Sequence, residues 1–232
     1  MSNNTYQLVM VTGTSSGIGK AIADHLLTLG LNILGVDISS SKIEHGCYEH
    51  QILDLTDTKA LQEAFSNLEV DAFIHAAGFL RVGNVGDLDI EAGQNMWRLH
   101  TQAAEIITNA LIPQMMSRSK GRIIYIGSRV SNGFPGRSQY AATKAALVAM
   151  AKSYAIEVAQ FGITINVVSP AATQTSMTSD PSRSASQPKL PPIGRLINPQ
   201  EIAELVTFLL SPSAAAITGQ EITICGGSSL NH

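Results

Sequence analysis

The sequence predicts an α/β protein: a doubly wound parallel sheet of about seven strands with helices on both faces. Apolar, strand-like runs recur along the 232 residues, and helical patterns separate most of them. A glycine-rich turn joins the first apolar run to the first helical pattern. With 44% hydrophobic residues the chain can bury one sizeable core. We therefore treat residues 1–232 as a single domain.

The strands are expected to pair in parallel, because strand and helix alternate along the chain. Such alternation predicts right-handed crossovers and a ligand crevice at the carboxyl ends of the strands. The crossover between Asp37 and Asp54 has room for only one or two helical turns. The expected strands are 8–12, 33–36, 51–53, 72–75, 122–126, 164–168 and 221–224.

One segment differs in composition from the rest of the chain. Residues 178–192 are rich in Ser and Pro and contain few apolar side chains. This composition predicts a mobile loop over the ligand crevice. An insertion without function is the alternative.

The glycine turn indicates a phosphate-binding loop. Gly13, Gly17 and Gly19 stand between the first strand and a helix. Glycine is needed where the backbone takes positive φ or where a Cβ would block a neighbour, and a helix N-terminus favours an anion. The spacing G-x-x-x-G-x-G differs from the usual dinucleotide fingerprint, so the interpretation depends on the strand, turn and helix around it.

Asp37 ends the second strand at about the distance expected of a carboxylate that binds an adenosine ribose. Its charge would repel a 2′-phosphate, and no arginine follows it directly. We therefore predict NAD as the cofactor rather than NADP. The alternative is that Asp37 is only a turn residue at a strand end.

Three downstream residues predict hydride-transfer chemistry. Tyr140 and Lys144 are four apart on an expected helix from 139 to about 161, so they share one face. A phenol ordinarily has a pKa of about 10, and an ammonium together with the positive nicotinamide stabilises the phenolate. Ser128 follows strand 122–126, where its hydroxyl can bind the substrate oxygen. The alternative for Tyr140 and Lys144 is an ordinary helix face.

Composition argues against several other functions. A net charge of −3 and a pI near 6.0 provide no field for a polyanion, so we expect no nucleic-acid partner. No apolar run is long enough to span a bilayer, and the first residues lack a signal-peptide pattern. We expect a cytoplasmic protein. Cys47 and Cys225 have no metal-ligand spacing, and we predict no metal.

The chain resembles the short-chain dehydrogenases/reductases over essentially its whole length. The motifs are Thr12-Gly13-x-x-x-Gly17-Ile18-Gly19, Asp54-Leu55, Ala76-Ala77-Gly78, Ser128, Tyr140-x-x-x-Lys144, Asn166-Val167-Val168-Ser169-Pro170, Thr175 and Gly226-Gly227. The resemblance implies a Rossmann-type fold, an NAD-dependent enzyme and a homotetramer that pairs long helices, for which Ala145, Ala146, Ala149 and Ala159 are small enough. Packing of these small residues onto the sheet is the alternative.

In this family the residues that match Asp54 and Leu55 contact adenine, and the residue that matches Thr175 holds the nicotinamide carboxamide. The expected cofactor-binding residues are Gly13, Ser15, Ser16, Gly17, Ile18, Gly19, Asp37, Ile38, Asp54, Leu55, Ala76, Ala77, Gly78, Tyr140, Lys144, Pro170, Thr173 and Thr175.

The chain departs from the family pattern at several positions. His75 replaces the usual first Asn of Asn-Ala-Ala-Gly, and we expect it to be structural. His100 stands where the family's catalytic tetrad has an asparagine. The asparagine acts partly through its main-chain carbonyl, so activity can survive; His100 could also relay protons itself, or activity could be weakened. The loop from Ser128 to Tyr140 is one residue short, and Ala171 replaces a common glycine.

Local features are similar to the 2,3-dihydro-2,3-dihydroxybenzoate dehydrogenases of siderophore biosynthesis, notably residues 78–83, 168–177 and 226–230. A substrate carboxylate would need a cation, and we name Arg81, Arg129 and Arg137 as candidates, with Met177 also at the substrate. A solvated rim is the alternative for each arginine. The leading hypothesis is an NAD-dependent dehydrogenase of a small cyclic alcohol. The alternatives are a 3-oxoacyl thioester reductase and a nucleotide-binding sensor that has lost turnover.

Overall fold

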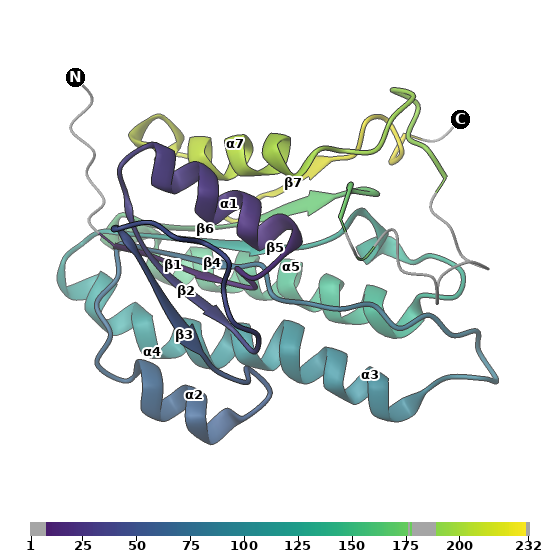
Figure 1. Ribbon diagram of the computed structural model, residues 1–232, viewed down its shortest axis with the longest axis horizontal. Coiled ribbons are helices and arrows are strands. Elements are labelled where there is room, and N and C mark those ends of the chain that lie inside the picture. The colour runs from purple at the N-terminus through teal and green to yellow at the C-terminus, as the bar shows by residue number, and fades with distance from the viewer. Residues whose placement is uncertain (1–7, 176, 178–188, 231–232) are drawn as a thin grey trace.

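A computed structural model describes residues 8–175, 177 and 189–230 (Figure 1). Seven parallel strands form one sheet in the order β3-β2-β1-β4-β5-β6-β7, which confirms the predicted fold class. The strands are β1 (Leu8–Thr12), β2 (Asn32–Asp37), β3 (Tyr48–Ile52), β4 (Ala72–His75), β5 (Gly121–Ile126), β6 (Ile163–Pro170) and β7 (Glu221–Ile224).

Helices cover both faces of the sheet (Figure 1). One core lies between the sheet and α1 and α7, around Ile22, Leu26 and Val206. The other lies between the sheet and α2, α4 and α5, around Phe65 and Leu147. The helices are α1 (Gly17–Thr28), α2 (Thr58–Phe65), α3 (Ile90–Trp97), α4 (Ala103–Ser117), α5 (Ser138–Val158) and α7 (Pro199–Leu210). Shorter turns are η1 (Arg98–Gln102, a π-helix), η2 (Arg129–Asn132), η3 (Ala159–Phe161) and η5 (Pro212–Ala214).

The crossover from β2 to β3 differs from the expectation. Residues 38–47 contain no helix, so even the one or two turns that the sequence allowed are absent. β3 begins at Tyr48, three residues before the predicted strand. It is an edge strand with one neighbour, β2, and its polar side chains do not give the apolar signal of the central strands.

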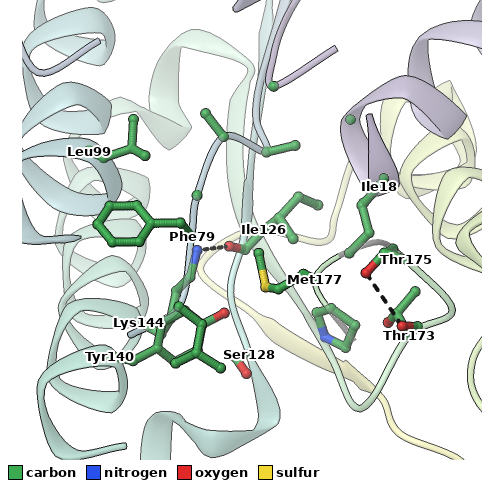
Figure 2. A pocket seen from close by; sticks show the side chains of 18 of the residues that line it. Ile18, Phe79, Leu99, Ile126, Ser128, Tyr140, Lys144, Thr173, Thr175 and Met177 are labelled. Carbon is green, nitrogen blue, oxygen red and sulfur yellow. Dashed lines mark hydrogen bonds between the residues drawn. The ribbon is translucent and has the colours of Figure 1, made fainter. Parts of the chain in front are cut away.

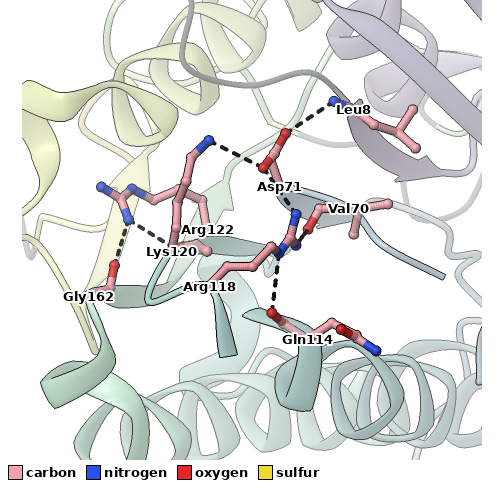
Figure 3. Close-up of polar contacts among 9 residues, drawn as sticks. Leu8, Val70, Asp71, Gln114, Arg118, Lys120, Arg122 and Gly162 are labelled. Atoms are coloured by element: carbon pink, nitrogen blue, oxygen red, sulfur yellow. Dashed lines mark hydrogen bonds and ion pairs between the residues drawn. The ribbon is translucent and has the colours of Figure 1, made fainter. Parts of the chain in front are cut away.

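The amino ends of β1, β4 and β5 meet at Asp71, a buried residue just before β4 (Figure 3). Its carboxylate accepts hydrogen bonds from Lys120 Nζ at 3.2 Å and from the Leu8 N–H at 3.3 Å. Arg118 Nη1 lies 3.5 Å from the same carboxylate, and Arg118 Nη2 donates to the Val70 carbonyl at 2.7 Å. Two cations thus compensate one buried charge. This cluster joins amino ends of the strands, whereas the predicted site lies at their carboxyl ends.

The sheet order reverses between β1 and β4. The chain first builds β2 and β3 on one side of β1, and then continues with β4 to β7 on the other. Crossovers leave in opposite directions from β1 and β4, which opens a crevice beyond their carboxyl ends. Thr12 and His75, the last residues of these strands, are register partners at this point.

Candidate active site

A cavity of about 1490 Å³ lies at the carboxyl ends of the strands. The loop between β1 and α1 lines one part of it, and the end of β5 with the start of α5 lines another. Figure 2 shows Ile18, Thr173 and Thr175 around one region of the cavity, and Ser128, Tyr140 and Lys144 around another. The predicted phosphate loop and the predicted catalytic residues therefore share one space.

The glycine loop has the geometry that its sequence predicts. Gly13 and Gly17 have φ of 78° and 57°, where only glycine is unstrained. A Cβ on Gly19 would collide with the Gly13 carbonyl oxygen, and one on Gly17 would lie 3.6 Å from the Thr175 side chain. Ser16 precedes α1 without a side-chain cap, and the first turn contains no acid. No side chain caps the first N–H groups of α1, so they can bind a phosphate.

Asp37 is held in place by the loops on either side of it. Its carboxylate accepts hydrogen bonds from the main-chain N–H groups of Ser15 at 3.0 Å and Ser39 at 2.9 Å. The Ser15 hydroxyl donates to the Ser39 carbonyl at 2.9 Å. Asp37 and Ile38 line the cavity, whereas Ser15 does not. Ser15 thus positions Asp37 instead of facing the cavity itself.

Tyr48 connects the same region to the glycine loop, a role that the sequence analysis did not assign. Its hydroxyl donates to Thr14 Oγ1 at 2.9 Å and lies 2.9 Å from His50 Nδ1. His50 Nε2 in turn donates to the Ser39 carbonyl at 2.9 Å. A Cβ at Gly35 would collide with the Tyr48 hydroxyl. The only signal in the sequence is a glycine in a strand, which often marks such a close approach.

Ser128, Tyr140 and Lys144 line the same cavity. Ser128 follows β5, is buried, and accepts a hydrogen bond from the Val130 N–H at 3.4 Å. Tyr140 and Lys144 lie in the first two turns of α5. Lys144 Nζ is 5.8 Å from the centre of the Tyr140 ring and donates to the Ile126 carbonyl at 2.8 Å (Figure 2). The end of β5 thus positions both the serine and the ammonium beside the phenol.

The burial of Lys144 changes its proton affinity. Loss of hydration lowers the pKa of the Lys144 ammonium from 10.5 to about 7. A nearby negative charge would stabilise the ammonium form of Lys144 and raise its pKa again. Formation of a phenolate at Tyr140 and retention of the Lys144 proton therefore favour each other. This coupling fits an activating lysine and not a nucleophile.

His100 does not face the cavity, and the structure gives its ring no free nitrogen. It is fully buried in η1, where Nε2 accepts a hydrogen bond from the Phe79 N–H at 3.1 Å. Nδ1 must then carry the proton, and it donates to Thr143 Oγ1 at 2.8 Å. Burial, and next the charge of Lys144, lower the pKa of His100 well below its usual value. A proton relay through this ring is therefore not supported.

The buried His100 ring instead positions Tyr140. The two rings meet edge to face with centroids 5.5 Å apart. The Thr143 hydroxyl that accepts from His100 also donates to the Tyr140 carbonyl at 2.8 Å. His100 thus belongs to the support of the phenol, a correction to its predicted place among the catalytic residues.

His75 has the structural role that we expected. Its Nδ1 lies 3.0 Å from Thr12 Oγ1, and its Nε2 donates to the Leu99 carbonyl at 3.0 Å. Burial, and next the charge of Lys144, lower the pKa of His75 to about 3. The neutral ring connects β1 and β4 to the π-helical turn that carries His100. Within the described part of the chain, no group of three His, Cys, Asp or Glu side chains could hold a metal.

Most predicted contact residues lie in the cavity wall. Arg81 does not: its Nε pairs with Asp89 at 3.2 Å, outside the lining, so we remove it from the predicted substrate contacts. Lys189 lines the cavity, whereas residues 178–188 of the predicted loop lie outside the described residues. Predicted residues in the wall are Gly13, Ser16, Gly17, Ile18, Gly19, Asp37, Ile38, Asp54, Leu55, Ala76, Ala77, Gly78, Ser128, Arg129, Arg137, Tyr140, Lys144, Pro170, Thr173, Thr175 and Met177.

Several lining residues were not predicted. Phe79, Leu80 and Leu99 follow β4 or lie in η1, and Phe134 lies between Arg129 and Arg137 in sequence. Apolar residues of this kind carry no motif, because any buried position could use them. Their contribution became visible only when the fold brought the loops together.

Known proteins resemble the chain over almost its whole length. A protein-family model described as enoyl-(acyl carrier protein) reductase matches residues 13–229. The 3-oxoacyl-[acyl-carrier-protein] reductase FabG of Salmonella typhimurium is 34% identical in an alignment of 236 positions, gaps included, that covers 95% of this chain and 96% of the relative. The chain belongs to the short-chain dehydrogenase/reductase family. It is therefore an oxidoreductase that acts on CH–OH or keto groups.

Further known proteins agree with this assignment. Oxidoreductase UcpA of Salmonella typhimurium is 31% identical in an alignment of 257 positions, gaps included, that covers 99% of this chain and 97% of the relative. A family member from Francisella tularensis superposes with a TM-score of 0.87 at 27% identity, over 97% of this chain and 99% of that one. The Brucella melitensis 3-ketoacyl-(acyl-carrier-protein) reductase, solved with NADH, superposes with a TM-score of 0.86 at 25% identity, over 97% of this chain and 98% of that one.

Proposed function

We propose that this enzyme transfers hydride between NAD and a small secondary alcohol or its ketone. The observation that carries the proposal is the single cavity that joins the glycine loop and Asp37 to Ser128, Tyr140 and Lys144. Such a cavity can hold an extended cofactor with its reactive ring beside a proton-transfer group.

The wall of the cavity fits a dinucleotide. The uncapped start of α1 suits the pyrophosphate, Asp37 suits the ribose hydroxyls, and Thr175 beside Gly17 suits the carboxamide. When bound, the nicotinamide accepts the hydride in oxidation or supplies it in reduction.

The chain's own residues then move the proton. In oxidation, the substrate hydroxyl gives its proton to the Tyr140 oxygen, and the Lys144 ammonium stabilises the phenolate that receives it. The Ser128 hydroxyl binds the substrate oxygen as its charge changes. In reduction, Tyr140 returns the proton to the same oxygen.

We further propose NAD over NADP. At the ends of β2 and β3 the described cavity wall consists of Asp37, Ile38 and residues 53–56, and none of these residues is a cation. A 2′-phosphate there would meet the Asp37 carboxylate without a compensating charge. We expect kcat/KM for NAD to exceed that for NADP by at least about tenfold. Steady-state kinetics with both cofactors, over cyclic, steroid and acyl alcohols, measure this ratio; a strong preference for NADP would overturn the assignment.

Tyr48→Phe is expected to raise KM for NAD while leaving kcat nearly unchanged. The substitution removes the hydroxyl that connects Thr14 to His50, and with it the support of the loop that holds Asp37. Loss of one net hydrogen bond corresponds to about 2- to 12-fold in KM. Tyr154→Phe, on α5, is the matched control. A Tyr48→Phe enzyme with wild-type KM would show that the contact does not support cofactor binding.

The substrate class has two candidates. The FabG relatives and the Brucella reductase favour a 3-oxoacyl thioester over the siderophore dihydrodiol. Two cavity arginines, Arg129 and Arg137, favour a small substrate with a negative charge. Turnover of an acetoacetyl thioester, compared with that of cyclic hydroxy acids, separates the two.

We also propose a cytoplasmic homotetramer. In the described part of the chain no helix is long and apolar enough to cross a membrane. Ala149 and Ala159 are exposed, and Ala145 and Ala146 are partly exposed, so these small residues do not all pack onto the sheet. Ala145, Ala146 and Ala149 thus leave part of α5 open to close contact with a second copy, and Ala159 follows directly in η3.

A further inference from the structure

Two arginines on the segment between Ser128 and Tyr140 line the cavity. Arg129 follows Ser128 directly, and Arg137 stands three residues before Tyr140 at the start of α5. Their guanidinium carbons lie 5.4 Å and 4.9 Å from the centre of the Phe134 ring. Phe134 is 40% exposed and also lines the cavity. Both guanidinium groups therefore contact the same aromatic ring, and all three side chains line the cavity.

The segment that carries these arginines is held at several points. Gly133 and Gly136 have φ of 100° and 71°, conformations that favour glycine and allow two sharp turns. The Gly83 N–H donates to the Gly136 carbonyl at 2.9 Å, which ties the segment to the loop after β4. Arg129 Nη1 lies 3.4 Å from the Ser228 carbonyl after β7. Loops from distant parts of the sequence thus fix the cations in place.

The charge of Arg129 is not neutralised within the described protein. Elsewhere the described arginines Arg81, Arg118 and Arg195 pair with carboxylates. Arg129 instead contacts a carbonyl and a ring, and no described carboxylate lies within ion-pair distance of it. The carboxylates in the described cavity wall are Asp37, which ends β2, and Asp54, which follows β3, whereas Arg129 follows β5.

We infer that Arg129 and Arg137 form a carboxylate-binding subsite, and that the substrate is a small hydroxy or oxo acid. Guanidinium groups bind carboxylates through paired charge-assisted hydrogen bonds, and both cations line the cavity that Tyr140 also lines. The Phe134 ring offers an apolar surface for the carbon skeleton. The carboxylate itself is unchanged: the hydride leaves the carbinol carbon for the cofactor, and the proton goes to Tyr140. A neutral acyl chain would use neither cation.

This inference rests on the proposed function, and a binding experiment tests the two separately. The NADH-loaded protein is titrated with cyclohexanecarboxylate and, as the neutral match, with cyclohexanecarboxamide, by calorimetry. We expect the carboxylate to bind at least about tenfold more tightly. Arg129→Gln and Arg137→Gln should each weaken carboxylate binding by about 10- to 100-fold and leave carboxamide binding unchanged. Arg81→Gln, whose guanidinium pairs with Asp89 outside the cavity wall, is the control.

The outcomes are distinguishable. Failure of the protein to bind NADH would refute the proposed function, and the subsite with it. NADH binding without any preference for the carboxylate, or equal carboxylate binding by Arg129→Gln, Arg137→Gln and the wild type, would overturn the subsite alone. Arg129→Lys checks the geometry: it keeps the charge and should restore only part of the affinity, because an ammonium lacks the paired donors.

Discussion

Replacing Tyr140 with phenylalanine should lower kcat by about 10² to 10⁴ and leave the affinity for NADH close to that of the wild type. The substitution removes only the phenol oxygen. The ring keeps its edge contact with His100, and the main-chain carbonyl still accepts from Thr143. The glycine loop and Asp37, which carry most of the proposed cofactor contacts, are untouched. The loss should therefore fall on proton transfer and not on binding.

Stopped-flow or steady-state kinetics give the change in kcat, and NADH fluorescence gives the affinity. Tyr154→Phe makes the same chemical deletion on the same helix and should behave as wild type. Unchanged turnover in Tyr140→Phe would remove the proposed mechanism. A parallel loss of NADH affinity would instead assign Tyr140 a role in holding the cofactor.

The sequence predicted the sheet well where strands are buried on both faces. β5 and β6 are buried throughout. Residues 123–126 of β5 form an uninterrupted apolar run, and β6 keeps four β-branched apolar residues among its buried polar ones. β3 lies at an edge, and its exposed Glu49 carries no strand signal. Its position was missed by three residues, because an edge strand is specified by pairing with β2 and not by its own composition.

The candidate site was predictable where motifs are local. Gly13, Gly17 and Gly19 are specified by turn geometry within one loop, and Tyr140 and Lys144 by one helical turn. Contacts that depend on the path of a loop were not predictable. Examples are the ion pair of Arg81 with Asp89 and the hydrogen bond from the Phe79 N–H to the buried His100 ring, because no periodicity encodes such a path.

Replacing Lys144 with methionine should lower turnover more than about 10²-fold and, near neutral pH, stabilise the cofactor-free protein. Loss of hydration lowers the pKa of the buried ammonium to about 7, so the charged form of Lys144 costs free energy in the folded protein. Methionine has similar length and needs no hydration. Its cost is the hydrogen bond from Lys144 to the Ile126 carbonyl, about 1 kcal/mol. We expect a net gain on the order of 1–3 kcal/mol in the free energy of unfolding.

The pH dependence identifies the cause of this gain. Between pH 7 and 10.5, the unfolded wild type holds a proton on Lys144 that the folded protein has released, so wild-type stability rises with pH across this window. Below about pH 7 both states are protonated, and the full cost of the buried charge remains. The advantage of Lys144→Met should thus be largest at or below pH 7 and shrink towards pH 10. Urea unfolding at pH 6.5, 8 and 9.5 measures it, with Lys152→Met, exposed on the same helix, as control. A difference that does not change with pH would show that packing, and not the buried charge, sets the stability of the variant.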